Sequence, residues 1–356
     1  MNRFRFLLPG VLLLTLMLTA CEYDDVVENR PAAELLNAWL LNEGLWNGNN
    51  AELSHFNADN GLIENDVFAR SNERRLGDTG QDILLYGDKL YVSVFASGTI
   101  EVVNPATGVS IRQIGMGDRQ PRYMAAHGGK IYVSCYTPHS VVRIDTATFE
   151  IEATCRLSGL RPEGMCVVGN SLYVCNSFDQ RGNGSIVYDS TLSIVDLTTF
   201  EETERLSIGL NPNHIDSVSP TRLAVCCWGD YEGTPSDIVV FDVGTHQRVS
   251  TGIAATGIAV GSGFFVAFYQ SYTGSSQTSF CAIDAATLTA TPIFEHHASR
   301  FVSPYGIAVN PANGDILVTD SQNYRANGDI YCFALDGTLR WKAETTMGPS
   351  RICFVK

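Results

Sequence analysis

A unit of roughly 45 residues recurs along the chain, and it constrains the fold more than any other feature. The clearest copy begins at Pro162 as an apolar run, a tight Gly-Asn-Ser turn and a second apolar run, which is the pattern of a β-hairpin. A third apolar run follows and ends in an Asp-x-x-Thr turn at residues 196–199, and a fourth leads into the next copy. Copies begin at Gly80, Pro121, Pro162, Pro212, Ala255, Pro304 and Pro349, which are 41 to 50 residues apart. Four strands at this spacing are typical of a β-propeller blade.

The two ends of the chain are expected to complete the last blade together. Only residues 349–356 follow the seventh repeat start, which is enough for one inner strand. Residues 38–43 match the second strand of a unit, residues 51–57 match the third, and the stretch to about Arg75 is expected to supply the fourth. Closing the ring in this way leaves no unpaired edge strand. We therefore predict an all-β, seven-bladed β-propeller over residues 38–356, with the N- and C-terminal strands sharing the closing blade.

The first residues of the sequence have the pattern of a secretory signal. Arg3 and Arg5 precede a mostly apolar run from Phe6 to Leu18, and small residues end at Ala20 immediately before a cysteine. This junction resembles the lipobox of bacterial lipoproteins, in which the thiol of that cysteine is acylated. We expect residues 1–20 to be a lipoprotein signal peptide, Cys21 to carry the lipid, and residues 21–37 to form an acidic tether. An ordinary signal peptide followed by a coincidental cysteine is the alternative.

Composition excludes several classes of partner. The formal net charge of −14 argues against binding nucleic acid, or an anionic membrane surface, by electrostatic attraction. No segment after the signal is long and apolar enough to cross a bilayer, so lipid alone would anchor the chain. Nine cysteines besides Cys21 lie mostly in apolar strand segments, where they are expected to pack as free, small hydrophobic residues. No CxxC pair occurs, so we predict no metal site.

One rim of the predicted disc is rich in aromatic residues. The starts of the inner strands and the loops between second and third strands should lie at the same rim, which we call the loop face; tight turns should form the opposite rim, the turn face. An aromatic residue in or beside all seven of these loops suggests a platform for a large, flat or amphipathic ligand. Alternatively, each ring packs over its own blade as a plug. The predicted aromatic ligand-binding residues are Trp46, Phe95, Tyr136, Phe178, Trp228, Tyr231, Tyr269, Tyr272 and Tyr324.

Polar candidates come from the inner-strand starts and the adjoining connections. Lysine is nearly absent from the mature part, so the positive charge there is guanidinium, which binds carboxylate, amide or phosphate groups through a planar fork and stacks on rings. The alternative is that these residues form ion pairs with Asp118, Glu163 and Asp216 inside the channel mouth. The further predicted ligand-binding residues are Arg119, Arg122, Arg161, Asn213, His214, Arg300, Tyr305, Arg325 and Arg351.

An enzyme is the competing interpretation. Glu163 and His214 begin adjacent blades and could converge as an acid/base pair, as in lactonase or lyase propellers. The Glu, Asn and Asp set of calcium-dependent lactonases cannot be assembled from matching positions, and the repeated tryptophan docking motif of quinoprotein propellers is missing. We therefore assign no catalytic residue and expect no prosthetic group.

The repeats resemble those of the YncE-like, or YVTN-repeat, propeller family, whose blades read roughly P-x-G-I-x-V, G-x-x-L-Y-V and V-x-V-I-D-x-x-T. Together with Cys21, the acidic residues after it and the opening segment 41–51, they resemble the surface-exposed cobalamin-binding propeller lipoproteins of Bacteroidetes. The resemblance implies that the chain is anchored in the outer membrane, faces the cell exterior, captures cobalamin or another corrinoid, and passes it to a TonB-dependent transporter. A surface protein that binds glycans or peptides, or a scaffold propeller, remains the alternative.

Overall fold

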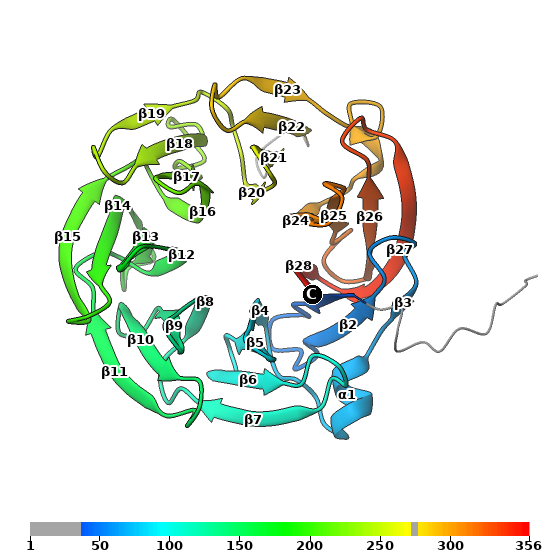
Figure 1. Ribbon diagram of the computed structural model, residues 1–356, viewed down its shortest axis with the longest axis horizontal. Helices are drawn as coiled ribbons and strands as arrows, with labels where there is room; N and C mark the ends of the chain where they lie inside the picture. Colours follow the sequence, from blue (N-terminus) through cyan, green and yellow to red (C-terminus); the bar gives the residue numbers. More distant parts are fainter. Residues whose placement is uncertain (1–36, 272–276, 356) are drawn as a thin grey trace, which may run out of the picture.

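Seven four-stranded antiparallel sheets form a ring around a common axis in the computed structural model, which describes residues 37–271 and 277–355 (Figure 1). The inner strands are β4 (Gly80–Tyr86), β8 (Pro121–His127), β12 (Pro162–Val168), β16 (Pro212–Ser219), β20 (Gly257–Val260), β24 (Pro304–Val309) and β28 (Pro349–Phe354). Six of them begin at the predicted residue, and β20 begins two residues after Ala255. The predicted seven-bladed propeller is therefore confirmed.

The other strands follow the repeat outward from the axis. The second strands are β1 (Ala38–Asn42), β5 (Lys89–Val94), β9 (Lys130–Cys135), β13 (Ser171–Gln180), β17 (Arg222–Cys227), β21 (Phe264–Gln270) and β25 (Ile316–Asp320). The third strands are β2 (Glu52–Phe56), β6 (Thr99–Val103), β10 (Ser140–Asp145), β14 (Ile186–Asp196), β18 (Asp237–Asp242), β22 (Thr278–Asp284) and β26 (Asn327–Phe333). The outer strands are β3 (Ile63–Glu64), β7 (Ser110–Gly115), β11 (Ile151–Arg156), β15 (Glu201–Ser207), β19 (Arg248–Ser250), β23 (Ala290–Pro292) and β27 (Leu339–Met347). We number the blades from the closing one, so blade 1 holds β28 and β1–β3, and blade 7 holds β24–β27.

Blade 1 closes the ring as predicted, with the order β28-β1-β2-β3. The C-terminal strand β28 pairs antiparallel with β1, where Leu40 lies opposite Ile352 and Ala38 lies opposite Phe354. Both faces of β1 are covered, since all five of its residues are buried. Strands from opposite ends of the sequence thus share one sheet, and the ring has no open edge.

The fourth strand of blade 1 corrects the sequence prediction. It was expected to run to about Arg75, but β3 has only two residues and the helix α1 (Val67–Asn72) follows it. The buried carboxylate of Glu52 explains the helix, because its Oε1 atom accepts a hydrogen bond of 2.8 Å from the backbone N–H of Phe68. Val67 and Phe68 then bury their side chains against the blade. A strand at this position would remove the donors Phe68 and Ala69 and leave the carboxylate with the N–H of Leu53.

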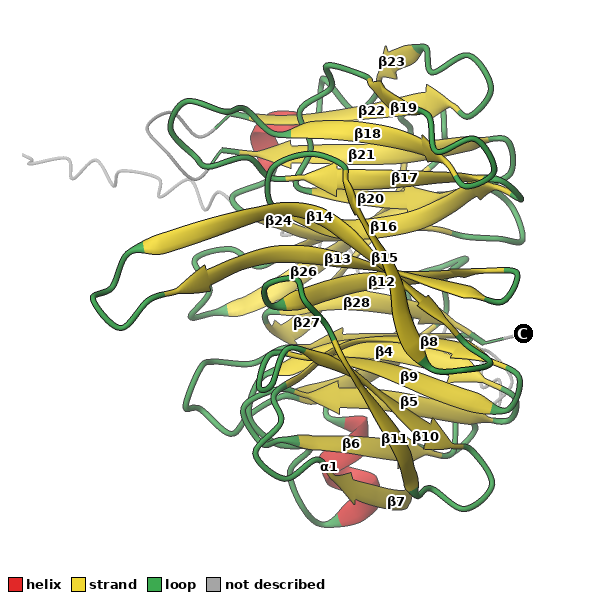
Figure 2. Ribbon diagram, turned by 90° about the vertical axis from the view of Figure 1, so that its left-hand side faces the viewer, coloured by secondary structure: helices red, strands yellow, loops and turns green. Residues whose placement is uncertain are grey.

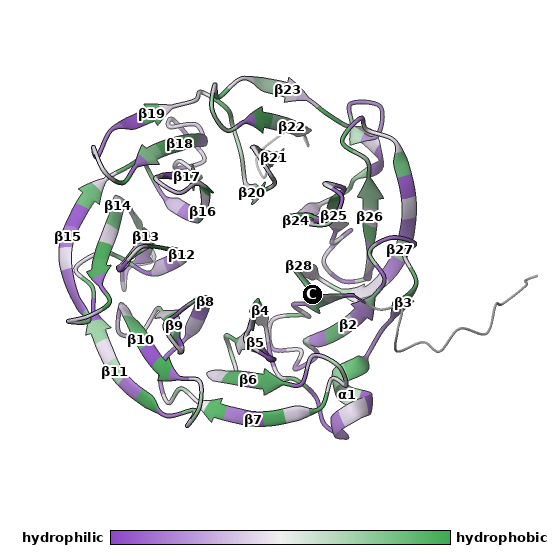
Figure 3. Ribbon diagram, in the orientation of Figure 1, coloured by the Kyte–Doolittle hydropathy of each residue, from purple (hydrophilic) through white to green (hydrophobic). Residues whose placement is uncertain are grey.

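Apolar side chains fill the spaces between neighbouring sheets. The second and third strands are the most hydrophobic, whereas the outer strands alternate polar and apolar residues toward solvent (Figure 3). The nine cysteines from Cys135 to Cys353 are free, and six of them are buried in this packing. No helix among the described residues is long and apolar enough to cross a membrane.

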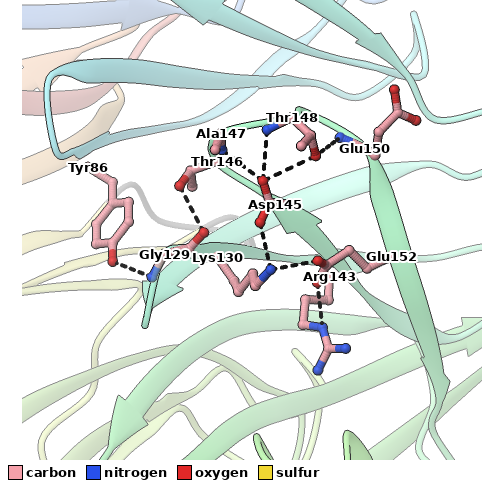
Figure 4. Close-up of polar contacts among 10 residues, drawn as sticks. All are labelled: Tyr86, Gly129, Lys130, Arg143, Asp145, Thr146, Ala147, Thr148, Glu150 and Glu152. Carbon is pink, nitrogen blue, oxygen red and sulfur yellow. Dashed lines mark hydrogen bonds and ion pairs between the residues drawn. The ribbon is translucent and has the colours of Figure 1, made fainter.

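The two faces of the disc differ in construction. Longer loops project from the loop face, and the β13–β14 hairpin extends beyond the other blades there (Figure 2). Short turns form the turn face, where Asp145 accepts backbone N–H bonds from Ala147 (2.9 Å) and Thr148 (2.7 Å) (Figure 4). Lys130 Nζ joins Asp145 and Glu152 there, at 2.6 Å from each carboxylate. The Asp-x-x-Thr pattern thus fixes the turns on this side.

Candidate ligand site on the loop face

A polar cavity of about 140 Å³ lies on the axis, at the starts of the inner strands. Every blade except blade 4 contributes to its wall. Five predicted site residues meet there, namely Arg122, His214, Trp228, Tyr305 and Arg351. They come together because each lies at or next to the first residues of an inner strand, or just after a second strand, and the ring brings these positions to one point.

The Arg122 guanidinium is already committed to a carboxylate. Its Nε and Nη2 atoms contact the two oxygens of Glu163 at 3.0 and 3.1 Å, and the ring of Tyr136 lies 4.7 Å away. Glu163, which is 1% exposed, also accepts a hydrogen bond from the Tyr136 hydroxyl. The expected alternative of an ion pair in the channel mouth therefore holds for Arg122. The suggested acid/base pair of Glu163 and His214 is not assembled, because both oxygens of that carboxylate are bound by Arg122.

Arg351 has a different environment. Its Nη2 atom lies 3.2 Å from Nδ1 of His214, and its guanidinium lies 4.9 Å from the centre of the Tyr123 ring. Burial, together with the nearby positive charge of Arg351, lowers the pKa of His214 well below its usual value. The imidazole is therefore neutral, and Nδ1 can accept a hydrogen bond from Arg351. The edge-on ring of Trp228 packs on the same imidazole at 5.7 Å.

Two carboxyl groups that the sequence prediction missed complete this region. Glu43 follows β1 and accepts a hydrogen bond from the Tyr305 hydroxyl. Burial raises its pKa, although Tyr305, Arg122 and Arg351 oppose that shift. Asp82, at the third position of β4, accepts the N–H of Met124 at 2.8 Å, and burial raises its pKa to about 6. The signal for Asp82 was its place two residues after a repeat start, the same place as Tyr123, His214 and Arg351.

Exposed aromatic rings lie in loops of the same face of the disc. Trp46 is 61% exposed, Tyr231 41% and Tyr324 37%, and they come from blades 1, 5 and 7. Tyr269 and Tyr231 line a second depression of about 220 Å³, which shares Trp228 with the axial cavity. Exposed rings thus come from several blades on this face, and their use as a platform for a ligand stays a prediction.

One of the predicted rings is covered by its neighbours from the adjacent blades. Phe95 is 8% exposed, because it packs between Trp46, at 5.8 Å, and Tyr136, at 5.6 Å. It can support Trp46 but has little surface of its own to offer a ligand. Phe178 is partly covered by Arg161, whose guanidinium lies 5.2 Å from the ring.

Several predicted residues lie apart from the cavity. Arg300 is a correction: it ends the short helix η2 (Ala298–Arg300), which contacts β22 in the outer part of blade 6, because the long β23–β24 connection carries it away from the axis. Arg161 pairs with Asp179 at 3.0 Å, and Arg119 donates to the carbonyl of Met116 at 3.1 Å. Asn213 is buried, with 2% of its surface exposed, and Arg325 is exposed in the β25–β26 loop. Tyr272 and Cys21 lie outside the described residues.

Metal binding has no candidate in the part of the chain that the structure describes. No group of three or more His, Cys, Asp or Glu side chains there could hold a metal ion. The axial carboxylates are instead surrounded by arginine, tyrosine and histidine side chains. Hydrogen bonding and ring stacking are therefore the interactions that this site offers a ligand.

Comparison with known proteins supports the fold and leaves the function open. The family described as a domain of unknown function (DUF5074) matches residues 37–180. No curated protein matches the sequence. A quinoprotein alcohol dehydrogenase-like protein from Bacteroides thetaiotaomicron VPI-5482 is similar at a TM-score of 0.64 and 14% identity, covering 88% of this chain and 77% of that chain.

Two further solved structures show how widely this architecture is shared. A protein from Bacteroides fragilis NCTC 9343, provisionally assigned as a 6-phosphogluconolactonase, has a TM-score of 0.62 at 11% identity and covers 92% of this chain and 100% of its own. The hydrazine synthase of Kuenenia stuttgartiensis has a TM-score of 0.62 at 14% identity. The match covers 74% of this chain and 85% of that chain. At such identities the similarity establishes the propeller fold alone.

Proposed function

We propose that this chain is a surface lipoprotein that captures cobalamin or another corrinoid across its loop face. The observation that carries the proposal is the set of exposed rings, Trp46, Tyr231 and Tyr324, in loops of the same face as the polar axial cavity. A corrinoid is a broad macrocycle with apolar surface and a fringe of amide side chains. Exposed aromatic rings suit the macrocycle, and arginine, glutamate and tyrosine side chains suit the fringe.

Size decides how such a ligand would bind. The axial cavity, of about 140 Å³, is too small to enclose a macrocycle of this kind. The ring system would therefore lie over the mouth of the cavity, between the projecting loops, and only a side arm would enter. The extended β13–β14 hairpin would then border the ligand on one side (Figure 2).

The location and partner rest on the first residues of the sequence. The signal pattern of residues 1–20, the acylation site at Cys21 and the acidic residues 22–28 support a lipid anchor in the outer membrane, with the propeller facing the exterior. A corrinoid bound there is too large to diffuse through the membrane. We infer that it passes to a TonB-dependent outer-membrane transporter.

Isothermal titration of cobalamin against the soluble mature chain tests the proposal. We expect binding at micromolar protein. Tyr231→Ala should weaken it roughly 30-fold, since truncating an aromatic contact at a binding hot spot costs about 2 kcal/mol. The matched control is Leu335→Ala, which removes an apolar side chain that is 46% exposed in the β26–β27 turn, on the turn face.

The outcomes separate the ligand from its location. Absence of heat with cobalamin at micromolar protein contradicts the corrinoid proposal, and heat with an oligosaccharide panel instead would establish the glycan-binding alternative. Equal losses from Tyr231→Ala and Leu335→Ala would show that the ligand does not lie on the loop face. A loss of cobalamin affinity in Tyr231→Ala alone supports both the corrinoid ligand and its place on the loop face.

A further inference from the structure

Two oppositely charged side chains, Glu43 and Arg351, line the axial cavity without a direct contact between them. The side chain of Glu43 has one hydrogen-bond partner. Its Oε2 atom accepts a hydrogen bond from the hydroxyl of Tyr305. Arg351 contacts the neutral imidazole of His214 through Nη2 and the face of Tyr123. Among the described residues, neither side chain lies within 4 Å of an opposite charge, although the charge of Arg351 acts at longer range on both Glu43 and Asp82. Both side chains line the cavity, and the Tyr305 hydroxyl contacts Glu43 through Oε2 rather than Oε1.

This arrangement is costly unless something else occupies the cavity. Glu43 and Arg351 are both partly buried, and a partly buried charge is less favourable when it lacks a close partner of opposite charge. Arg122, the other guanidinium in the wall, does have such a partner, because Glu163 holds it with two contacts of 3.0 and 3.1 Å. The contrast between two arginines in one cavity indicates that Arg351 and Glu43 are kept for a ligand.

We propose that the axial cavity binds a primary carboxamide group, with Glu43 accepting its N–H and Arg351 donating to its carbonyl oxygen. The inference rests on the proposed function, in which an amide arm of the corrinoid enters the cavity. A primary carboxamide carries a donor and an acceptor side by side and no charge, so it satisfies both side chains.

Groups of similar shape fit less well. A carboxylate would bring a second negative charge next to Glu43, and an ammonium group would bring a second positive charge next to Arg351. Each would also leave one of the two side chains without its complement. The cavity should therefore discriminate an amide from the corresponding acid.

The experiment compares cobalamin with its monocarboxylic acids, each of which has one peripheral carboxamide hydrolysed to a carboxylate. Affinities are measured by isothermal titration for the wild type, for Glu43→Gln, and for the control Glu150→Gln, which makes the same change at an exposed residue on the turn face. We expect at least one of the acids to bind the wild type and the control 10-fold or more weakly than cobalamin. In Glu43→Gln, that preference should shrink to within about threefold. Thermal unfolding of each variant checks that the fold is kept.

A second measurement separates this inference from the proposed function. Trp228 lines the cavity, so its fluorescence reports occupancy when wild type and Trp228→Phe are compared. Propionamide at millimolar concentration should change this signal in the wild type more than propionate does, and Glu43→Gln should remove the preference. If no corrinoid binds but propionamide is preferred, the proposed function fails and the carboxamide site stands. If cobalamin binds and all its acids bind within twofold of it, or if Glu43→Gln keeps the preference, the carboxamide site is wrong.

Discussion

The carboxyl groups of the turn face and those of the axial cavity are perturbed in opposite directions. On the turn face, backbone N–H groups and Thr hydroxyls lower the pKa values of Asp196, Asp242 and Asp284. At the axis, burial raises the pKa values of Glu43 and Asp82. The fold stabilises the carboxylate form of the first group, whereas burial disfavours the charged form of the second.

This difference separates structural charges from functional ones. An aspartate that ends a third strand satisfies two N–H groups of the next turn, so its charge contributes to folding. Glu43 accepts a side-chain hydrogen bond from Tyr305 and lines the axial cavity, so turn formation does not explain its presence. Perturbed groups that do not stabilise the fold are candidates for binding. The following predictions test whether the two faces divide in this way.

Removing residues 349–356 should lower the stability of the protein more than any other change, because the deletion affects both faces of the disc. It deletes the inner strand of blade 1, together with Ser350 and Arg351 in the cavity wall. β1 then loses a partner along its length, and the ring opens. We expect loss of the cooperative thermal transition in circular dichroism and rapid proteolysis, whereas a chain lacking only Lys356 should melt like the wild type. A truncated chain that melts cooperatively at the wild-type temperature would refute the closing role of β28.

Ionisation of Asp82 should lower the free energy of unfolding. Its pKa of about 6 in the folded chain exceeds the usual value of 3.8, so the folded state binds the proton more tightly and ionisation destabilises it. This destabilisation is absent below about pH 4, grows toward pH 6 and stays constant above that. At neutral pH it amounts to about 3 kcal/mol at most. Urea unfolding at pH 4 to 7 should show Asp82→Asn gaining stability relative to the wild type as pH rises; a difference independent of pH would contradict the shift.

The sequence predicted the fold almost completely, because each blade repeats the same local pattern. Strand starts such as Pro121 and Pro304 are correct to the residue, and pairing of the two ends follows from counting strands. The helix α1 was missed because it depends on a buried contact between Phe68 and Glu52, which no local pattern shows.

The site was predicted less completely. Positions at inner-strand starts were expected to meet, and five of the predicted residues do line the cavity. Side-chain packing between blades decides two features of the site. Arg122 pairs with Glu163 and is not free for solvent, and Phe95 is buried. Glu43 was missed because it follows a second strand rather than starting an inner one. Repetition predicts where a residue lies, whereas its partners depend on the departures from repetition.

Matched changes on the two faces should separate affinity from stability. Trp228→Ala removes a ring that lines both loop-face cavities and packs on His214, so cobalamin affinity should fall by roughly 30-fold. Lys130→Ala on the turn face removes ion pairs with Asp145 and Glu152 (Figure 4) and should leave affinity within about twofold. Titration calorimetry of both variants decides between the faces. A larger loss of affinity from Lys130→Ala than from Trp228→Ala would reverse their assignment.

The smallest effect is expected from a single turn of the turn face. Asp196→Ala removes the acceptor of two backbone N–H bonds of 2.8 Å, from Thr198 and Thr199, and should lower Tm by roughly 1 to 2 °C while leaving cobalamin affinity within about twofold. Asp196→Asn keeps an acceptor oxygen and should lose less. Because these contacts lower the pKa of Asp196, its stabilisation is present above the ordinary aspartate pKa and is lost as pH falls through the lowered value. The Tm difference between wild type and Asp196→Ala should therefore shrink in acid. For Asp82 the pH dependence has the opposite sign, because ionised Asp82 destabilises the fold whereas ionised Asp196 stabilises it. A Tm difference for Asp196→Ala that grows in acid would show that the turn-face aspartates do not stabilise the fold as carboxylates.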